Sequence, residues 1–283
     1  MKQQVHSINP HAAKETSLLA LAKSLMKHRQ LILQMIKREV IGRYKGSVIG
    51  LAWSFFNPIF MLSVYTIVFS MIFKARWGDV GEENKIQFAL ILFVGIIVLN
   101  FFTEVVNRAP NLILSNVNYV KKVVFPLEIL SVVSIGTALF HALISFIVLM
   151  LAFIGFNGFL HSTVLLAPVV FLPLTILLLG LSWILASLGV FLRDVGHTIG
   201  LLTTLLMFLS PIFYPISAVP ISLQPYILAN PMSFVIEQTR LVMIAGQFPN
   251  WIGMGIYMII ANLVMIFGFI LFQKTRKGFA DVI

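Results

Sequence analysis

The sequence has no cysteine and few charged residues, and these two shortages already limit what it can be. Without cysteine there are no disulfide bonds and no thiolate chemistry. Only 11% of the 283 residues are charged and 59% are hydrophobic, whereas globular domains are about 25% charged. This composition excludes a soluble domain and indicates a membrane protein that crosses the bilayer several times.

Motifs for chemistry are also missing. No GxxxxGK[ST] loop is present to bind ATP, and the six histidines show neither HxxxH nor HExxH spacing. No carboxylate lies in the middle of an apolar run, where ion-coupled carriers need one. We therefore expect no catalytic residue, no metal and no cofactor in this chain, so that energy for any transport comes from a partner.

Five stretches contain no Asp, Glu, Lys or Arg, and they predict the membrane spans. They are residues 46–73, 86–103, 129–192, 195–236 and 241–273. A span needs about 20 residues, so 129–192 holds two, divided at residues 157–162, and each of the others holds one. The prediction is an all-α fold of one domain, 1–283. It comprises an N-terminal cytoplasmic or interfacial segment (1–45), a six-span region (46–273) and a cytoplasmic tail (274–283).

The positive charges predict the orientation. Sixteen of the 20 Lys and Arg residues fall in the N-terminal segment, near residues 108–122 and 193, or in the tail. Under the positive-inside rule both termini are cytoplasmic, and the net charge of +10 reports topology and attraction to lipid rather than nucleic-acid binding. Two other ionisable groups receive local interpretations. We expect Glu104 to pair with Arg108 one helical turn away, and His141 to have a structural, hydrogen-bonded role.

Two short basic segments are predicted to be amphipathic helices. The stretch NRAPNLILSNVNYVKKVVFP, residues 107–126, alternates apolar and polar residues between two spans and suggests a helix at the cytoplasmic membrane surface. Leu31–Lys45 repeats apolar residues at 33, 36, 40 and 44, which favours a basic interfacial helix over a solvated flank. The spacing of Gly42, Gly46 and Gly50 is compatible with a close helix contact at a dimer seam.

A third unusual segment is rich in proline. Five of the 12 prolines lie at residues 211, 215, 220, 225 and 231, a density that a continuous helix cannot carry. We expect the fifth span to end near Ser210–Tyr214, followed by short re-entrant or interfacial helices. Glu237 and Arg240 stand three residues apart and are within reach of one another on a helix.

Four motifs carry a family resemblance. They are FFTEVVNRAPNLILSNVNYVKKVVFPLEIL, FLRDVGHTIG, SPIFYPISAVP and NPMSFVIEQTR, in this order and at residues 101–130, 191–200, 210–220 and 230–240. Over residues 29–283 the chain resembles permease subunits of ABC-2-type exporters, and more narrowly the branch that exports O-antigen, capsular polysaccharide or teichoic acid. A drug or lipid exporter of the same type is the alternative, and a membrane-embedded transferase or a passive channel is a weaker one.

The resemblance implies a homodimer in the bacterial inner membrane. A separate ATP-binding subunit would bind beneath each chain and carry ATP and Mg²⁺. The cargo would be a lipid-linked polysaccharide. The implied ATPase-coupling helix is Asn111–Lys122, with Asn111, Ser115, Asn116, Tyr119, Lys121 and Lys122 as contact residues. The implied interfacial helix, Leu31–Tyr44, includes Ile36, Lys37, Arg38 and Tyr44.

Two further sets complete the expected site. Because aromatic rings stack on sugar faces, Trp53, Phe56, Asn57, Phe60 and Tyr65 on the first span are candidates to line the channel. The implied outer gate lies within Pro211–Arg240 and includes Pro211, Tyr214, Pro215, Glu237 and Arg240.

Overall fold

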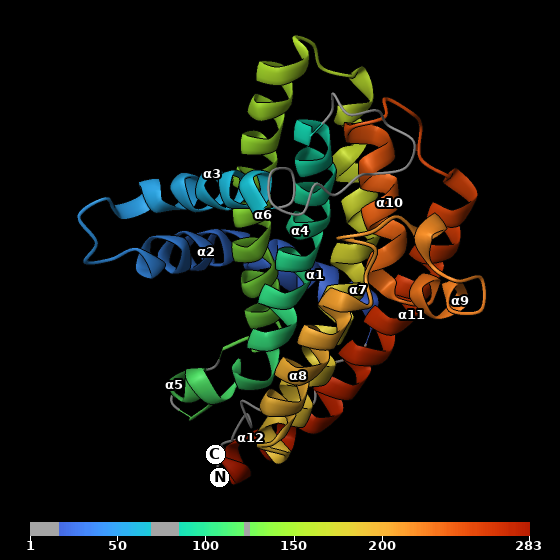
Figure 1. Ribbon diagram of the computed structural model, residues 1–283. Helices are drawn as coiled ribbons and strands as arrows, with labels where there is room; N and C mark the ends of the chain where they lie inside the picture. The colour runs from blue at the N-terminus through green and yellow to red at the C-terminus, as the bar shows by residue number, and fades with distance from the viewer. Residues whose placement is uncertain (1–16, 69–84, 122–124) are drawn as a thin grey trace, which may run out of the picture.

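The structure is a computed structural model, and it describes residues 17–68, 85–121 and 125–283. All regular elements within these ranges are helices, as the sequence predicts (Figure 1). The longer helices are α1 (Leu18–Lys27), α2 (Arg29–Arg43), α3 (Trp53–Tyr65), α4 (Lys85–Arg108), α6 (Ile129–Asn157), α7 (Ala167–Phe191), α8 (Val195–Phe208), α10 (Pro231–Met243) and α11 (Trp251–Thr275). Short α-helices are α5 (Val117–Lys121), α9 (Gln224–Leu228) and α12 (Phe279–Val282). The 3₁₀ turns are η1 (Gly50–Ala52), η3 (Ala109–Asn111), η4 (Leu114–Asn116), η5 (Ser162–Leu166), η6 (Ile216–Ala218) and η7 (Arg276–Gly278).

Five helical stretches of the described residues are long and apolar enough to cross a membrane. They are Gly50–Val68, Ile86–Asn111, Ile129–Asn157, Ser162–Phe191 and Trp251–Val282. The expected fifth span corresponds to α8, which has 14 residues and is therefore about 21 Å long, short of the roughly 30 Å hydrocarbon layer. The structure thus supports five long apolar spans and does not establish the six-span count.

Helix α4 forms the centre of the molecule. Every residue from Phe88 to Leu99 is buried, because α6, α7, α8 and α10 pack around it. Figure 1 shows α2 and α3 projecting to one side, across α4 and α6. Of the five candidate spans, the one that contains α3 is the least buried by the rest of the chain.

Helices α7 and α11 pack closely along one another, and two glycines permit their approach. A Cβ added to Gly180 would lie 2.6 Å from the Met265 Cα, and one added to Gly268 would overlap the Gly180 carbonyl oxygen. Small residues at such crossings let backbones come together where packing, rather than the hydrophobic effect, drives association. The predicted glycine spacing at residues 42, 46 and 50 marks no such contact with the part of the chain that the structure describes. Gly46 and Gly50 instead have positive φ angles of 89° and 57° and belong to the turn between α2 and α3.

The Pro-rich segment is broken as expected. After α8 the chain forms η6 and α9 before α10 begins at Pro231. The start of α10 lies beside the end of α8, because the Asn230 side-chain amide donates to the Ser210 hydroxyl at 2.8 Å. In Figure 1, α8 occupies the lower part and α10 the upper part of the same side of the molecule.

Candidate functional site

Residues 109–121, here called the amphipathic segment, connect α4 to the chain that enters α6. The sequence predicted one helix over Asn111–Lys122, but the structure divides this stretch into η3, η4 and α5. Pro110 and three asparagines are poor helix formers, and the Asn116 side chain bonds to the Leu112 carbonyl oxygen at 2.8 Å. Lys122 lies outside the described residues.

The two sides of the amphipathic segment nevertheless differ as predicted. Its apolar side chains Leu112, Ile113 and Val120 are buried, while its polar side presents exposed side chains to the outside. The exposed polar residues are Asn111, Ser115, Asn118 and Lys121, and Asn116 is half-buried. The segment therefore offers a polar surface beside α12 at one end of the molecule (Figure 1).

Tyr119 belongs to the interior side of this segment. Its ring stacks on Phe125 with centroids 4.4 Å apart, and its hydroxyl accepts a hydrogen bond from the Arg38 guanidinium at 3.2 Å. Arg38 comes from α2, the helix predicted as interfacial, so Tyr119 joins the two predicted contact elements to one another. The expected contact between Tyr119 and an ATP-binding subunit stays a prediction.

Helix α2 packs through much of the predicted apolar face, with Leu33 as the exception. Ile32, Met35 and Val40 are buried, whereas Leu33 and Lys37 are exposed. Ile36 is half-buried and sits directly over Gly136 of α6. Tyr44 follows the helix and meets His141 edge to face at 6.4 Å. Partial burial raises the pKa of Tyr44, so its hydroxyl stays protonated.

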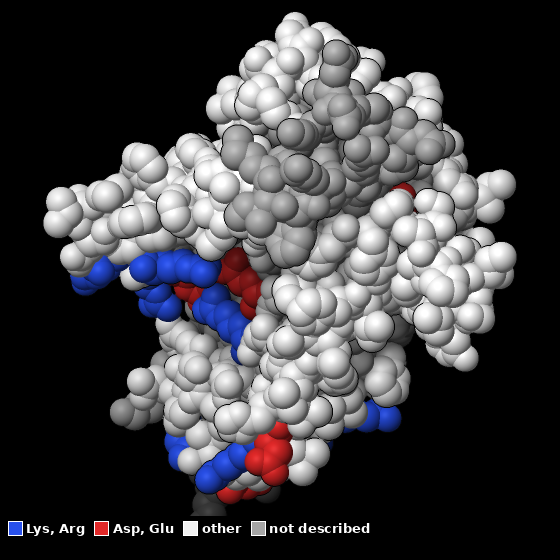
Figure 2. All heavy atoms as spheres, viewed as in Figure 1, with Lys and Arg blue, Asp and Glu red and all other residues white. Residues whose placement is uncertain are grey.

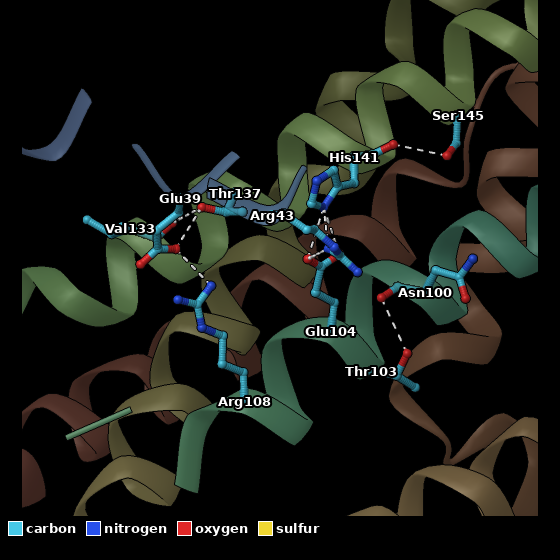
Figure 3. A network of polar contacts seen from close by, with 10 residues as sticks. All are labelled: Glu39, Arg43, Asn100, Thr103, Glu104, Arg108, Val133, Thr137, His141 and Ser145. Carbon is cyan, nitrogen blue, oxygen red and sulfur yellow. Dashed lines mark hydrogen bonds and ion pairs between the residues drawn. The ribbon is translucent and has the colours of Figure 1, made fainter. Parts of the chain in front are cut away.

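Three helices meet in a network of charges that the sequence interpretation missed (Figure 3). Glu39 accepts from Arg108 at 2.8 Å and from the Thr137 hydroxyl at 3.1 Å. A second group lies one helical turn away on each helix. Here Glu104 contacts His141 at 2.9 Å and the Arg43 guanidinium at 2.6 Å.

Each helix therefore contributes two residues four apart, in two layers of one network. The predicted Glu104–Arg108 pair is wrong, since both side chains turn to neighbouring helices. The predicted hydrogen-bonded role of His141 agrees with its contact to Glu104. No signal in the sequence indicates the two cross-helix ion pairs, because Glu39 and Arg43, like Glu104 and Arg108, have the spacing of a pair within one helix.

Two cavities adjoin this network. A cavity of about 640 Å³, here the charged cavity, is lined by Glu39, Gly42, Arg43, Glu104, Asn107, Arg108 and Thr137. Figure 2 shows Lys, Arg, Asp and Glu side chains gathered in a hollow below the projecting α2 and α3. A second cavity of about 440 Å³, here the amide cavity, shares Arg43, Glu104 and Asn107 with it and continues between α3, α4 and α6.

The amide cavity separates the predicted channel-lining residues into two groups. Asn57 and Tyr65 line it, together with Asn100 of α4 and Ser145 of α6. Trp53, Phe56 and Phe60 do not line it and are 43%, 53% and 65% exposed on the outside of α3. These three rings require a cover of lipid or protein, and their role in a channel remains a prediction.

A buried ion pair ties the amphipathic segment's exit to the C-terminal end. Arg276 donates to Glu128 at 3.0 Å and to the Phe125 carbonyl oxygen at 2.8 Å, and both charged side chains are at most 2% exposed. Glu128 also accepts from the Ser24 hydroxyl of α1 at 3.0 Å. The sequence interpretation missed this pair, because it treated Arg276 with the other basic residues of the tail as a solvated charge that indicates orientation in the membrane.

The predicted gate residues lie around one buried arginine. Arg240 contacts Glu237 at 2.9 Å, as predicted, and also donates to the carbonyl oxygens of Pro211 at 2.6 Å and Ile212 at 3.1 Å. A further bond to the Ile91 carbonyl oxygen at 3.2 Å reaches α4. Tyr214 donates to the Phe208 carbonyl oxygen at 2.8 Å, and Pro215 precedes η6. Arg240 therefore fixes the turn after α8 to α10 and α4.

The described residues include no group of three or more His, Asp or Glu side chains that could hold a metal ion. Long apolar helices around a buried central helix, with a polar surface at one end, define a helical membrane protein. The chain belongs to the ABC-2 type transporter family, which it matches over residues 30–244.

Similar proteins span nearly the whole chain. The O-antigen export system permease protein RfbA of Myxococcus xanthus is 26% identical over 94% of this chain and 100% of its own length. RfbA of Klebsiella pneumoniae is 24% identical over 89% of this chain and 95% of its own. The capsule polysaccharide export inner-membrane protein CtrC of Neisseria meningitidis serogroup B is 26% identical over 90% and 95%.

Proposed function

We propose that this chain is the membrane permease of an ATP-driven exporter that moves a lipid-linked, O-antigen-like polysaccharide out of the cytoplasm. The observation that carries the proposal is similarity along almost the full length to permeases named for O-antigen and capsule export. Membership of the ABC-2 family agrees with transport. The polar cavities of α4 and α6 suit a hydrophilic cargo better than an apolar drug.

The energy source in this proposal is a separate ATP-binding subunit that holds ATP and Mg²⁺. Its docking surface would be the polar side of the amphipathic segment, which faces outward at the end occupied by α12. The hydrogen bond between Arg38 and Tyr119 would let α2 move with that surface. Lys121 is exposed there, and Lys37 is exposed on α2; both would favour an acidic partner face or anionic lipid.

The assembly would be a homodimer in the bacterial inner membrane with both termini in the cytoplasm. The exposed rings of Trp53, Phe56 and Phe60 give α3 an apolar side that a second copy could cover. Helices α8 and α10, placed one above the other, would together make the fifth crossing along the chain and bring the total to six. The turn held by Arg240, with Pro211, Tyr214, Pro215 and Glu237, would be a gate on the outer side.

The experiment compares a strain without this chain with strains carrying the wild type or single variants. Loss of the chain should remove surface polysaccharide and leave polymer inside the cell. Asn118→Asp places a charge in the proposed docking surface and should reduce both co-purification of a tagged ATP-binding subunit and surface polymer, because an unpaired charge in a contact is costly.

Gln247→Glu is the matched control, since it makes the same amide-to-acid change at an exposed site between α10 and α11. It should leave both measurements unchanged. Normal surface polymer in the strain without the chain would refute the function. Normal complex and export with Asn118→Asp would refute only the docking surface.

A further inference from the structure

The amide cavity is polar in a part of the chain that is otherwise apolar. Its walls carry Ser54 and Asn57 from α3, Asn100 and Asn107 from α4, and Ser145 from α6. Polar side chains within apolar helices are costly unless they pair or contact a hydrophilic ligand. Their convergence from three helices on one volume therefore calls for an explanation beyond packing.

Two of these amides are available to a ligand. Asn57 and Asn100 are exposed to the cavity, and their side-chain amides form no hydrogen bond within the described part of the chain. Each amide offers both donors and an acceptor. Sugar hydroxyl groups likewise donate and accept, so an uncharged sugar can satisfy a pair of amides from both directions.

The charges beside the cavity do not favour an ionic ligand. Arg43 is engaged by Glu104, and Arg108 by Glu39, so each cation already has a carboxylate within 2.8 Å. An anion would have to displace a carboxylate, and a metal ion finds no cluster of ligands among the described residues. An apolar ligand would leave the amides and hydroxyls unpaired, which costs free energy.

Size and surroundings agree with a saccharide. A volume of about 440 Å³ lies within the roughly 300–1,000 Å³ of typical ligand sites. The Tyr65 ring is part of the lining and supplies an aromatic surface for a sugar face. The charged cavity adjoins the amide cavity, and the two share Arg43, Glu104 and Asn107 in their linings.

We propose that the amide cavity of each protomer binds an uncharged sugar unit of the transported polymer, held by Asn57 and Asn100. This inference rests on the proposed function and adds a binding site to it, on the side of α3 opposite to the exposed aromatic rings. Because a polymer must leave each site after entering it, the binding is weak and relies on a few hydrogen bonds.

The test is photo-crosslinking in cells that make the polymer. A diazirine amino acid is introduced at Ser145 or Met61, which line the cavity, and, as a control, at Leu143, which is 56% exposed on α6 and does not line it. After illumination the protein is purified under denaturing conditions and stained for periodate-oxidised carbohydrate. Carbohydrate should appear on the protein at both cavity positions and should be absent at Leu143 and in cells that lack polymer synthesis.

A second set of variants tests the amides themselves. In the Ser145 background, Asn57→Leu or Asn100→Leu should lower the carbohydrate signal about five-fold each, as expected for the loss of one hydrogen bond. Asn262→Leu, on α11 and away from the cavity, should not change it. Equal labelling at Leu143 and Ser145, or none at either cavity position, would overturn the proposal even where the strain without the chain still loses surface polymer. The proposed function would survive that outcome.

Discussion

At the scale of single residues, the buried pair of Arg276 and Glu128 offers the sharpest test of the structure. Arg276→Met removes the guanidinium that Glu128 contacts at 3.0 Å, and breaking a buried ion pair by removing one side chain costs about 3–5 kcal/mol. We expect a clear fall in the thermal unfolding temperature of the purified protein. Lys277→Met is the control, because the neighbouring lysine is exposed and a surface substitution changes stability by only about 0.5 kcal/mol.

The double variant Arg276→Met with Glu128→Gln separates charge from packing. Because the double variant also replaces the buried carboxylate with a neutral amide, it should recover part of the lost stability. Equal unfolding temperatures for Arg276→Met and Lys277→Met would show that the pair is solvated and that the structure is wrong at this point.

Residue-level predictions from the sequence succeeded where partners are near in sequence and failed where they are distant. Glu237 and Arg240 were expected to meet and do, at 2.9 Å. Glu104 and Arg108 have suitable spacing too, but such a helix pair is worth only about 0.3–0.5 kcal/mol. Arg43, Arg108, Glu39 and His141 offer better partners across helices, and no single-helix pattern reveals those.

At the scale of elements, the amphipathic segment is held against α7 by a glycine. A Cβ at Gly189 would overlap the Pro110 carbonyl oxygen and lie 2.7 Å from the Pro110 Cα. Because these are backbone atoms, no side-chain rotation can make room. Gly189→Ala should push η3 away from α7, destabilise the protein by about 1–3 kcal/mol and weaken its complex with the ATP-binding subunit.

Gly155→Ala is the control for this element. Gly155 lies in α6, and beyond its own helix backbone no atom of the described residues comes within 4 Å of its added Cβ. Alanine is favoured over glycine in a helix by about 0.5–1 kcal/mol. The variant should unfold at the same or a slightly higher temperature and bind the ATP-binding subunit normally. If Gly189→Ala behaves like Gly155→Ala, then η3 and α7 are not in contact.

Element boundaries were predictable where composition changes abruptly. The spans that contain α4, α6, α7 and α11 follow the charge-free runs, and the break after α6 falls at Gly158, whose φ of 75° ends the helix. The amphipathic segment carries two conflicting signals. Its apolar residues repeat with a helical period, whereas Pro110 and the asparagines favour turns. The prediction of one continuous helix followed the first signal, and the structure follows the second. The length of α8 also escaped prediction, since residues 195–210 contain no Asp, Glu, Lys or Arg to mark an end of the span.

At the scale of the whole molecule, the arrangement of α2 and α3 could not be derived from the sequence. Apolar residues predict that Gly50–Val68 avoids water, but they do not predict that α3 crosses α4 and α6 with an exposed aromatic side. The same limit applies to the candidate site. The sequence identified Asn57 and Tyr65, whereas Asn100 and Ser145 joined them only when three helices were placed in space.

The orientation of the molecule in the membrane gives the last prediction. Figure 1 places α5 at one end and the link between α10 and α11 at the other, and the basic residues concentrate at the α5 end. Since positive loops remain in the cytoplasm, Asn118 should face inward and Gln247 outward.

The chain has no cysteine, so a single thiol can be placed at either exposed position without background. In spheroplasts, a membrane-impermeant maleimide should label Gln247→Cys at once and should label Asn118→Cys only after permeabilisation. Labelling in detergent confirms that both thiols are reactive when a bound partner is removed. Labelling of Asn118→Cys in sealed spheroplasts, with Gln247→Cys protected, would invert the orientation and move the proposed ATPase surface to the wrong side of the membrane.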